Sequence, residues 1–145
     1  GDTLIVVNAY GINASTIEAA LKGKRMGAKI IAVTSTVFCR NIPRDHPARH
    51  PSGKNLCDLE EVDVVIDNKM PADDAVLSLK GLDVKACPVS TILNSFVLQV
   101  LVGCTVEKLL TQGIEPPVWK SANLPGGDEY NKKNLERYSA RIKRL

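Results

Sequence analysis

Hydrophobic residues near the start of the chain follow a strand–helix–strand pattern. Residues 3–8 predict a strand buried on both faces in a parallel sheet, because residues 4–7 form a continuous apolar run. Three residues then recur at helical spacing: Ile17, Ala20 and Leu21. They predict a helix that starts at the capping residue Asn13 and ends at Gly27. Residues 29–34 are a second buried strand, so we predict a right-handed β–α–β unit.

Similar patterns predict the elements of the remaining chain. The predicted elements after residue 55 are a short acidic helix at 56–61, a strand at 62–67, short strands at 76–79 and 83–87, a long helix at 91–112 and a charged helix at 129–145. The first half of the long helix is apolar almost all round. We therefore expect this helix to be buried on more than one side, against another subunit or another part of a longer protein.

The segment between the second and third predicted strands, residues 35–55, breaks every periodic pattern. It contains Pro43, Pro47 and Pro51, which exclude a continuous helix. Its cationic residues are Arg40, Arg44, Arg49 and Lys54. Because structureless stretches of this length are uncommon in compact domains unless they serve a site, we interpret the segment as a functional loop.

Composition excludes several classes of protein. The chain has 145 residues, 44% of them hydrophobic, and this size and composition suit one compact domain. Its net charge of +3 is too small to indicate a nucleic-acid partner. The cysteines at 39, 57, 87 and 104 form no close pair, so we expect reduced, mostly buried thiols in a cytoplasmic protein. The most apolar run, 96–106, is shorter than the ~20 residues that span a bilayer, so we expect no membrane association.

The order of elements resembles the SIS (sugar isomerase) phosphosugar-binding domain. The residues that carry this resemblance are GDTLIVV, IEAALKGKRMGAKIIAVTS, VDVVIDN and PVSTILN. Three further runs narrow the resemblance to a group of bacterial SIS-domain proteins of unassigned activity. They are RHPSGKNLCDLEEVDVVIDN, GIEPPVWKSAN and Gly127-Asp128-Glu129.

The resemblance implies a fold and an assembly. It implies an α/β fold: a three-layer, flavodoxin-like (Rossmann-like), mostly parallel sheet with helices on both faces. It implies a single SIS-type domain over residues 1–145, which forms a homodimer or higher homo-oligomer. It also implies that the chain is the C-terminal part of a longer protein, because the strand and helices that usually begin the family's domain do not match here.

Residues 8–13 depart from the family's phosphate loop. SIS domains carry hydroxyl side chains there, whereas this chain reads Asn8-Ala9-Tyr10-Gly11-Ile12-Asn13, which keeps the turn glycine and the helix cap. Backbone N–H groups at a strand-to-helix turn still favour an anion. The candidate phosphate- and substrate-binding residues are Asn8, Tyr10, Gly11, Asn13, Thr34, Ser35, Thr36, Ser52, Lys54 and Ser90.

Each of these residues also has a structural interpretation. Gly11 also fits an ordinary turn, and residues 34–36 can satisfy their own backbone at the end of a strand. Lys54 can pair with the acidic residues at 58–63, and Ser90 can cap the long helix. Three further positions fit both interpretations: Asp67 and Asn68 as ligand contacts or a turn, and Trp119 as a sugar platform or a loop anchor.

His50 is the candidate catalytic residue. An imidazole can move a proton next to a sugar carbonyl at neutral pH, although the sequence HPSG also fits a surface turn. His46 and His50 lie four residues apart, but the prolines around them exclude a helical metal site, so we expect no metal. The loop 8–13 has only one of the glycines of a dinucleotide fingerprint, and we expect no cofactor.

Two functions remain open from the sequence. The first is phosphosugar binding by a cytoplasmic SIS-type protein, as a sugar-phosphate isomerase or lyase. The second is a non-catalytic regulatory module that senses a sugar phosphate, because the hydroxyl residues of the family's phosphate loop are replaced here. The expected partner in both cases is a small-molecule phosphosugar.

Overall fold

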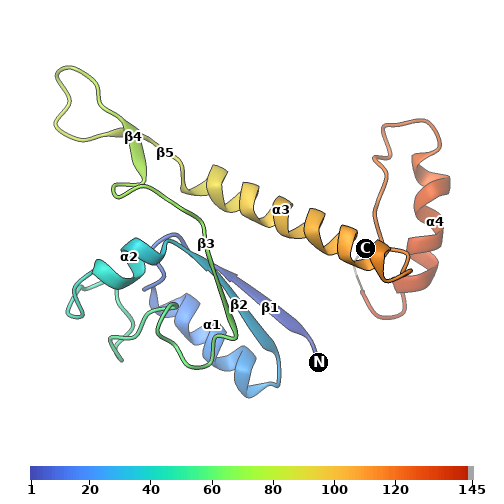
Figure 1. Ribbon diagram of the computed structural model, residues 1–145, viewed down its shortest axis with the longest axis horizontal. Coiled ribbons are helices and arrows are strands. Elements are labelled where there is room, and N and C mark those ends of the chain that lie inside the picture. Colours follow the sequence, from blue (N-terminus) through green and yellow to red (C-terminus); the bar gives the residue numbers. More distant parts are fainter. Residues whose placement is uncertain (144–145) are drawn as a thin grey trace. The chain divides into compact units, whose positions relative to one another are not determined.

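The computed structural model describes residues 1–143, which divide into two compact units, Gly1–Gln99 and the chain from Val100 onward. The elements of the first unit are β1 (Thr3–Val7), α1 (Ala14–Arg25), β2 (Lys29–Thr34), α2 (Thr36–Asn41), β3 (Val64–Asp67), β4 (Ala75–Leu77) and β5 (Ala86–Pro88). Helix α3 (Ser90–Thr111) crosses the boundary, and α4 (Gly127–Tyr138) lies in the second unit. Figure 1 shows the elements in chain order.

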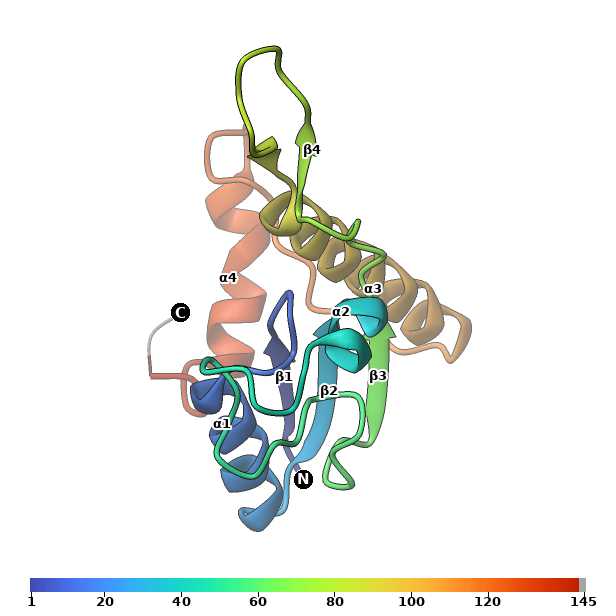
Figure 2. The same cartoon turned by 90° about the vertical axis from the view of Figure 1, so that its left-hand side faces the viewer.

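The first unit is a mixed α/β structure built on a three-stranded parallel sheet in the order β1-β2-β3. Ile5 on β1 pairs in register with Ile31 on β2, which pairs with Val64 on β3. The three strands run side by side, and α2 follows directly from the end of β2 (Figure 2). The predicted β–α–β unit is therefore confirmed, with α1 between the two strands.

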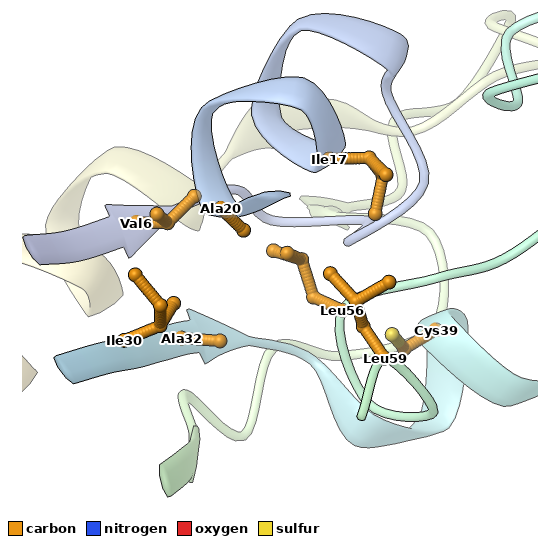
Figure 3. Close-up of a cluster of buried hydrophobic side chains, with 8 residues drawn as sticks. All are labelled: Val6, Ile17, Ala20, Ile30, Ala32, Cys39, Leu56 and Leu59. Carbon is orange, nitrogen blue, oxygen red and sulfur yellow. The ribbon is translucent and has the colours of Figure 1, made fainter. Parts of the chain in front are cut away.

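One face of this sheet packs against α1. Ile17 and Ala20 on the helix are fully buried against Val6, Ile30 and Ala32 on the strands (Figure 3). Three residues from the chain between β2 and β3 complete the cluster: Cys39, Leu56 and Leu59. A buried aliphatic side chain contributes about 1.5–3 kcal/mol, so this cluster anchors the segment 40–58 to the sheet. On the opposite face Ile5 and Val64 remain 41% and 48% exposed.

A carboxylate joins the start of β2 to the segment before β3. Asp63 accepts hydrogen bonds at 2.8 Å from the Lys24 ammonium on α1 and at 2.7 Å from the Ile30 N–H. Lys29 lies 3.4 Å from the same carboxylate. The hydrogen bond from Lys24, followed by that from Ile30, holds the pKa of Asp63 well below its usual range.

Two elements differ in kind from the sequence predictions. The six-residue helix α2 was not predicted, and it begins where the Ser35 side chain accepts a hydrogen bond from the Phe38 N–H. Residues 56–61 form turns instead of a short helix. The reason is Asn55, whose side-chain oxygen accepts from the Cys57 and Asp58 N–H groups at 2.8 and 3.0 Å and holds the backbone in a turn.

In the second unit, α4 is fastened to the extended segment before it. Asn131 exchanges two hydrogen bonds with the backbone of Lys120, at 2.8 and 2.7 Å. The buried Asn134 donates to the Val118 carbonyl at 3.0 Å. The two distinctive sequence runs, GIEPPVWKSAN and the one that begins at Gly127, therefore contact each other. The predicted charged helix ends at Tyr138, and residues 144–145 of that prediction lie outside the described residues.

Helix α3 is longer than the apolar run counted from the sequence. It spans 22 residues, and its length and composition meet the requirement for crossing a membrane, with none of its residues buried. A single helix of this kind is weak evidence for a membrane span, because the core helix of a water-soluble protein has the same properties.

The prediction of mostly buried thiols fails for two of the four cysteines. Cys104 on α3 and Cys87 on β5 are both exposed.

Candidate functional site

The turn between β1 and α1 is occupied by its own hydrogen bonds. The Asn8 side chain accepts from the Gly11 N–H at 2.6 Å, and the Gly11 carbonyl accepts from the Leu56 N–H at 2.8 Å. Gly11 has φ +68°, and a Cβ there would lie 2.6 Å from both Cys39 Sγ and Thr34 Oγ1. Glycine is therefore required for close packing at this turn. The Gly11 amide already has a protein acceptor.

The three hydroxyl residues at the end of β2 also have protein partners. Thr34 and Ser35 are buried. The Thr34 hydroxyl donates to the Ala9 carbonyl at 3.4 Å, and the Ser35 N–H donates to the same carbonyl at 3.0 Å. Thr36 donates its hydroxyl to Asp67 at 2.8 Å. Burial acts to raise the pKa of Asp67, but hydrogen bonds from Lys69 and Thr36 outweigh it and lower that pKa. These side chains connect the strand ends to one another.

The segment 42–54 is folded around the buried guanidinium of Arg49. This group donates to the Pro43 carbonyl at 2.7 Å, to the Gly53 carbonyl at 3.0 Å and to the Ile42 carbonyl. The Arg49 backbone also pairs with Asn13 in a β-bridge. One planar cation thus satisfies carbonyl oxygens from both ends of the segment. The predicted functional loop is therefore an ordered structure attached to the N-terminus of α1.

A basic hollow of about 400 Å³ opens beside this segment. Its side chains carry mainly positive charge, from Arg40, Arg44, Arg49 and Lys54, against one carboxylate, Asp58. Ser52, Gly53, Asn55 and Ile42 complete the lining. Lys54 is exposed and forms no ion pair within residues 1–143, so its charge is available to the hollow.

His50 lies in a chain of hydrogen bonds that reaches this hollow. Its Nε2 is 2.9 Å from Oε1 of Glu18 on α1, and its Nδ1 is 2.7 Å from the Ser52 hydroxyl. Because a carboxylate only accepts, Nε2 carries the proton and Nδ1 accepts from Ser52. The arrangement can therefore draw a proton from the Ser52 oxygen towards the imidazole.

A second hollow of about 350 Å³ shares Ile42 with the basic hollow. It is lined by Tyr10, Ile12, Asn13, Ile42, His46 and Ala48. The Tyr10 ring packs edge-on against Phe38, with the ring centroids 4.8 Å apart. Tyr10 and Asn13 thus line a different hollow from Ser52 and Lys54, although Ile42 borders both.

The remaining candidate residues line neither hollow. Ser90 donates its hydroxyl and its N–H to the Asp74 carboxylate at 2.8 and 2.6 Å, so it begins α3 as part of a cap. Asn68 is buried and donates to Asn94 at 2.8 Å. Trp119 belongs to the second unit and is 43% exposed. Residues 1–143 contain no group of three or more His, Cys, Asp and Glu side chains that could hold a metal ion.

Sequence comparisons identify the relatives of this chain. A family model described as SIS domain matches residues 1–35, which hold β1, α1 and β2. A UPF0309 protein of Streptomyces griseus is 36% identical over 98% of this chain and 54% of its own length. The UPF0309 protein TTE0306 of Caldanaerobacter subterraneus is 37% identical over 100% of this chain and 57% of its own. The resemblance to the SIS family is confirmed.

A third relative, the UPF0309 protein of Brucella anthropi, is 40% identical over 97% of this chain and 54% of its own length. This chain therefore spans about half the length of the curated relatives that it matches. The names of these relatives state neither a substrate nor a reaction.

Sequence reasoning missed two parts of the site. It treated the arginines at 40, 44 and 49 as a basic loop without naming them as contacts, although their clustering was a usable signal. It also did not name Glu18 as a site residue, although Glu18 contacts His50. No local pattern could have found this pair, because the two residues are 32 positions apart.

Proposed function

We propose that this chain binds a phosphorylated sugar, with the phosphate in the basic hollow. The observation that carries the proposal is the gathering of Arg40, Arg44 and Lys54 around a space of about 400 Å³. Arginine pairs with phosphate oxygens through two N–H groups, and lysine adds a point charge. The volume falls in the range of small-molecule sites. The match of residues 1–35 to the SIS domain supports a phosphosugar as the class of ligand.

We further propose that His50 moves a proton through Ser52. The Ser52 hydroxyl lines the basic hollow, so it can hydrogen-bond a sugar whose phosphate is held by Arg40 and Arg44. His50 Nδ1 then accepts a proton through Ser52, and Glu18 stabilises the charged imidazole. Aldose–ketose isomerisation needs this step, since a proton leaves the carbon beside the carbonyl and returns to its neighbour.

Binding is tested by calorimetric titration of the purified protein with inorganic phosphate and with a panel of hexose and heptose phosphates. We expect at least one sugar phosphate to bind more tightly than phosphate alone. Arg44→Gln should weaken its binding about tenfold, because a charge-assisted hydrogen bond contributes roughly 1.5–3 kcal/mol. Arg25→Gln on α1, whose guanidinium lies outside the hollow, is the matched control. Equal binding by the Arg44→Gln variant would contradict the assignment of the phosphate to this hollow.

Proton transfer is tested separately by NMR, through exchange of the sugar C2 proton in deuterated water. His50→Gln and Ser52→Ala should each abolish the exchange while leaving phosphate affinity within about twofold of the parent. His46→Gln changes the other histidine of the segment and should leave exchange intact. Exchange that survives in the His50→Gln variant would exclude the proposed role of this residue.

A second candidate is a non-catalytic module that senses a sugar phosphate. One observation favours it: both ring nitrogens of His50 already have protein partners, Glu18 and Ser52. A purely structural histidine has the same contacts. The same NMR experiment separates the two candidates, because a sensor binds the sugar phosphate without exchanging its C2 proton.

We also propose the remaining features that the SIS resemblance implies. These are a flavodoxin-like architecture with helices on both faces of the sheet, assembly into homo-oligomers and a cytoplasmic location. Light scattering tests the proposed assembly. A homo-oligomer should have a molecular mass at least twice that of the polypeptide.

A further inference from the structure

Cys39 and Cys57 lie side by side although they are far apart in the sequence. Cys39 is on α2 and fully buried, whereas Cys57 follows the site segment and is partly exposed. The Cys57 N–H donates to Cys39 Sγ at 3.2 Å. Because Cα lies about 1.5 Å from its own nitrogen, the Cys57 Cα is within about 4.7 Å of that sulfur. This separation is compatible with a disulfide, which requires neighbouring Cβ atoms.

The surroundings of the pair make the two thiols chemically different. Cys39 donates to the Asn55 side-chain oxygen at 3.0 Å and receives the Cys57 N–H. Hydrogen bonding with the Cys57 side chain lowers the pKa of the Cys39 thiol, and the same interaction raises that of Cys57. The thiol that solvent reaches first is the less acidic one.

We propose that Cys39 and Cys57 form a reversible disulfide when the protein meets a peroxide. The peroxide transfers one oxygen atom to the Cys57 sulfur, which becomes a sulfenic acid, and the first water is released. The Cys39 sulfur then attacks the Cys57 sulfur and gives up its thiol proton, and the hydroxide displaced from Cys57 takes up this proton and leaves as the second water. Two thiols thus give two electrons to the peroxide. A small thiol reductant reverses the bond by exchange.

The bond would close a loop that contains most of the candidate site. Residues 40–56 lie between the two cysteines and include Arg49, His50 and Ser52. A crosslink at the base of this loop restricts the unfolded chain, so the oxidised protein should resist unfolding more than the reduced one. The inference rests on the geometry of the two thiols and does not depend on which ligand the hollow takes.

The test starts from a variant in which the exposed cysteines are removed, Cys87→Ala/Cys104→Ala. Treatment of the folded variant with hydrogen peroxide should block both remaining thiols without producing disulfide-linked dimers. Mass spectrometry of an unreduced digest should show the peptides of Cys39 and Cys57 linked to each other, and dithiothreitol should separate them. The oxidised variant should also melt at a higher temperature than the reduced one.

Cys57→Ser in the same background is the control. Its Cys39 thiol should stay free, because it is buried and has lost its reaction partner. The unreduced digest of the wild-type protein gives the same readout without substitutions. Oxidation of Cys87 and Cys104 with Cys39 and Cys57 still free would overturn the proposal. Conversion of Cys57 to a sulfinic acid with Cys39 unreacted would also overturn it.

Discussion

Glu18 on α1 lies 2.9 Å from Nε2 of His50, and this contact joins the first helix of the sheet unit to the segment that surrounds the basic hollow. Only 13% of the His50 side chain is exposed, against 57% for Glu18. The exposed Glu18 carboxylate therefore contacts a largely buried imidazole. It determines that Nε2 of His50, rather than Nδ1, carries the proton. Under the proposed mechanism, Glu18 would act on the proton transfer through His50.

Glu18→Gln tests this positioning role. The amide keeps the size of the side chain but removes the charge that stabilises a protonated imidazole. We expect C2 proton exchange to fall on the order of tenfold, with phosphate affinity unchanged. Arg25→Gln removes only the longer contact to the other Glu18 oxygen, at 3.9 Å, and should have no effect. Loss of phosphate binding in the Glu18→Gln variant would instead indicate a structural role.

Gly11→Ala should destabilise the protein strongly. The added Cβ would lie 2.6 Å from two side-chain atoms in a backbone conformation that disfavours alanine, at a cost of about 3 kcal/mol. Gly53→Ala is a matched control, because Gly53 has the same φ of +68° but its nearest atom is 3.9 Å away. It should cost about 1 kcal/mol. Chemical denaturation measures both values, and equal losses would show that the close contact has no energetic effect.

Arg49→Met should cost about 3 kcal/mol of unfolding free energy. The substitution removes the guanidinium and leaves carbonyl groups of Ile42, Pro43 and Gly53 without their donor. Arg49→Lys should rescue little, because one ammonium cannot reach carbonyls on different sides. Limited proteolysis should cut both variants within 42–54 faster than the parent. Unchanged protection would mean that the hydrophobic anchors alone hold the segment.

Asp63→Asn should reduce stability in a pH-dependent way. The pKa of Asp63 is lower in the folded protein than its value of about 3.9 in an unfolded chain. Its contribution is therefore fully present above that unfolded value and is lost as the pH falls towards the folded one. The melting temperatures of parent and variant should differ most above about pH 5 and converge in acid. Glu60→Gln, which changes an exposed carboxylate, should give parallel curves.

The parts of the fold that depend on local pattern could be predicted from the sequence. The apolar runs of β1 and β2 and the spacing of Ile17 and Ala20 define buried surfaces that few other structures satisfy. The short helix α2 has no such stripe, and its start depends on one Ser35 contact. The turn at Asn55 also escaped prediction, because a side-chain hydrogen bond there competes with an otherwise helical sequence.

The site was less predictable, because its contacts join distant residues. The basic character of 40–54 was visible, but the burial of Arg49 depends on carbonyls that converge only after folding. The contact between Cys39 and Cys57 likewise has no signal in their spacing. The phosphate cradle expected around Gly11 was inferred from a family pattern, and the hydrogen bond from its amide to Asn8 becomes visible only in three dimensions.

The sheet has β2 at its centre and β1 and β3 as its two outer strands, and within residues 1–143 neither outer strand has a second neighbour. The outward N–H and C=O groups of such strands are templates for a further strand. Together with the uncovered Ile5 and Val64, they give concentrated samples of this polypeptide a route to insoluble β-aggregates. Crystallisation or NMR of residues 1–145 should therefore begin from dilute stocks or from a fusion to a highly soluble carrier.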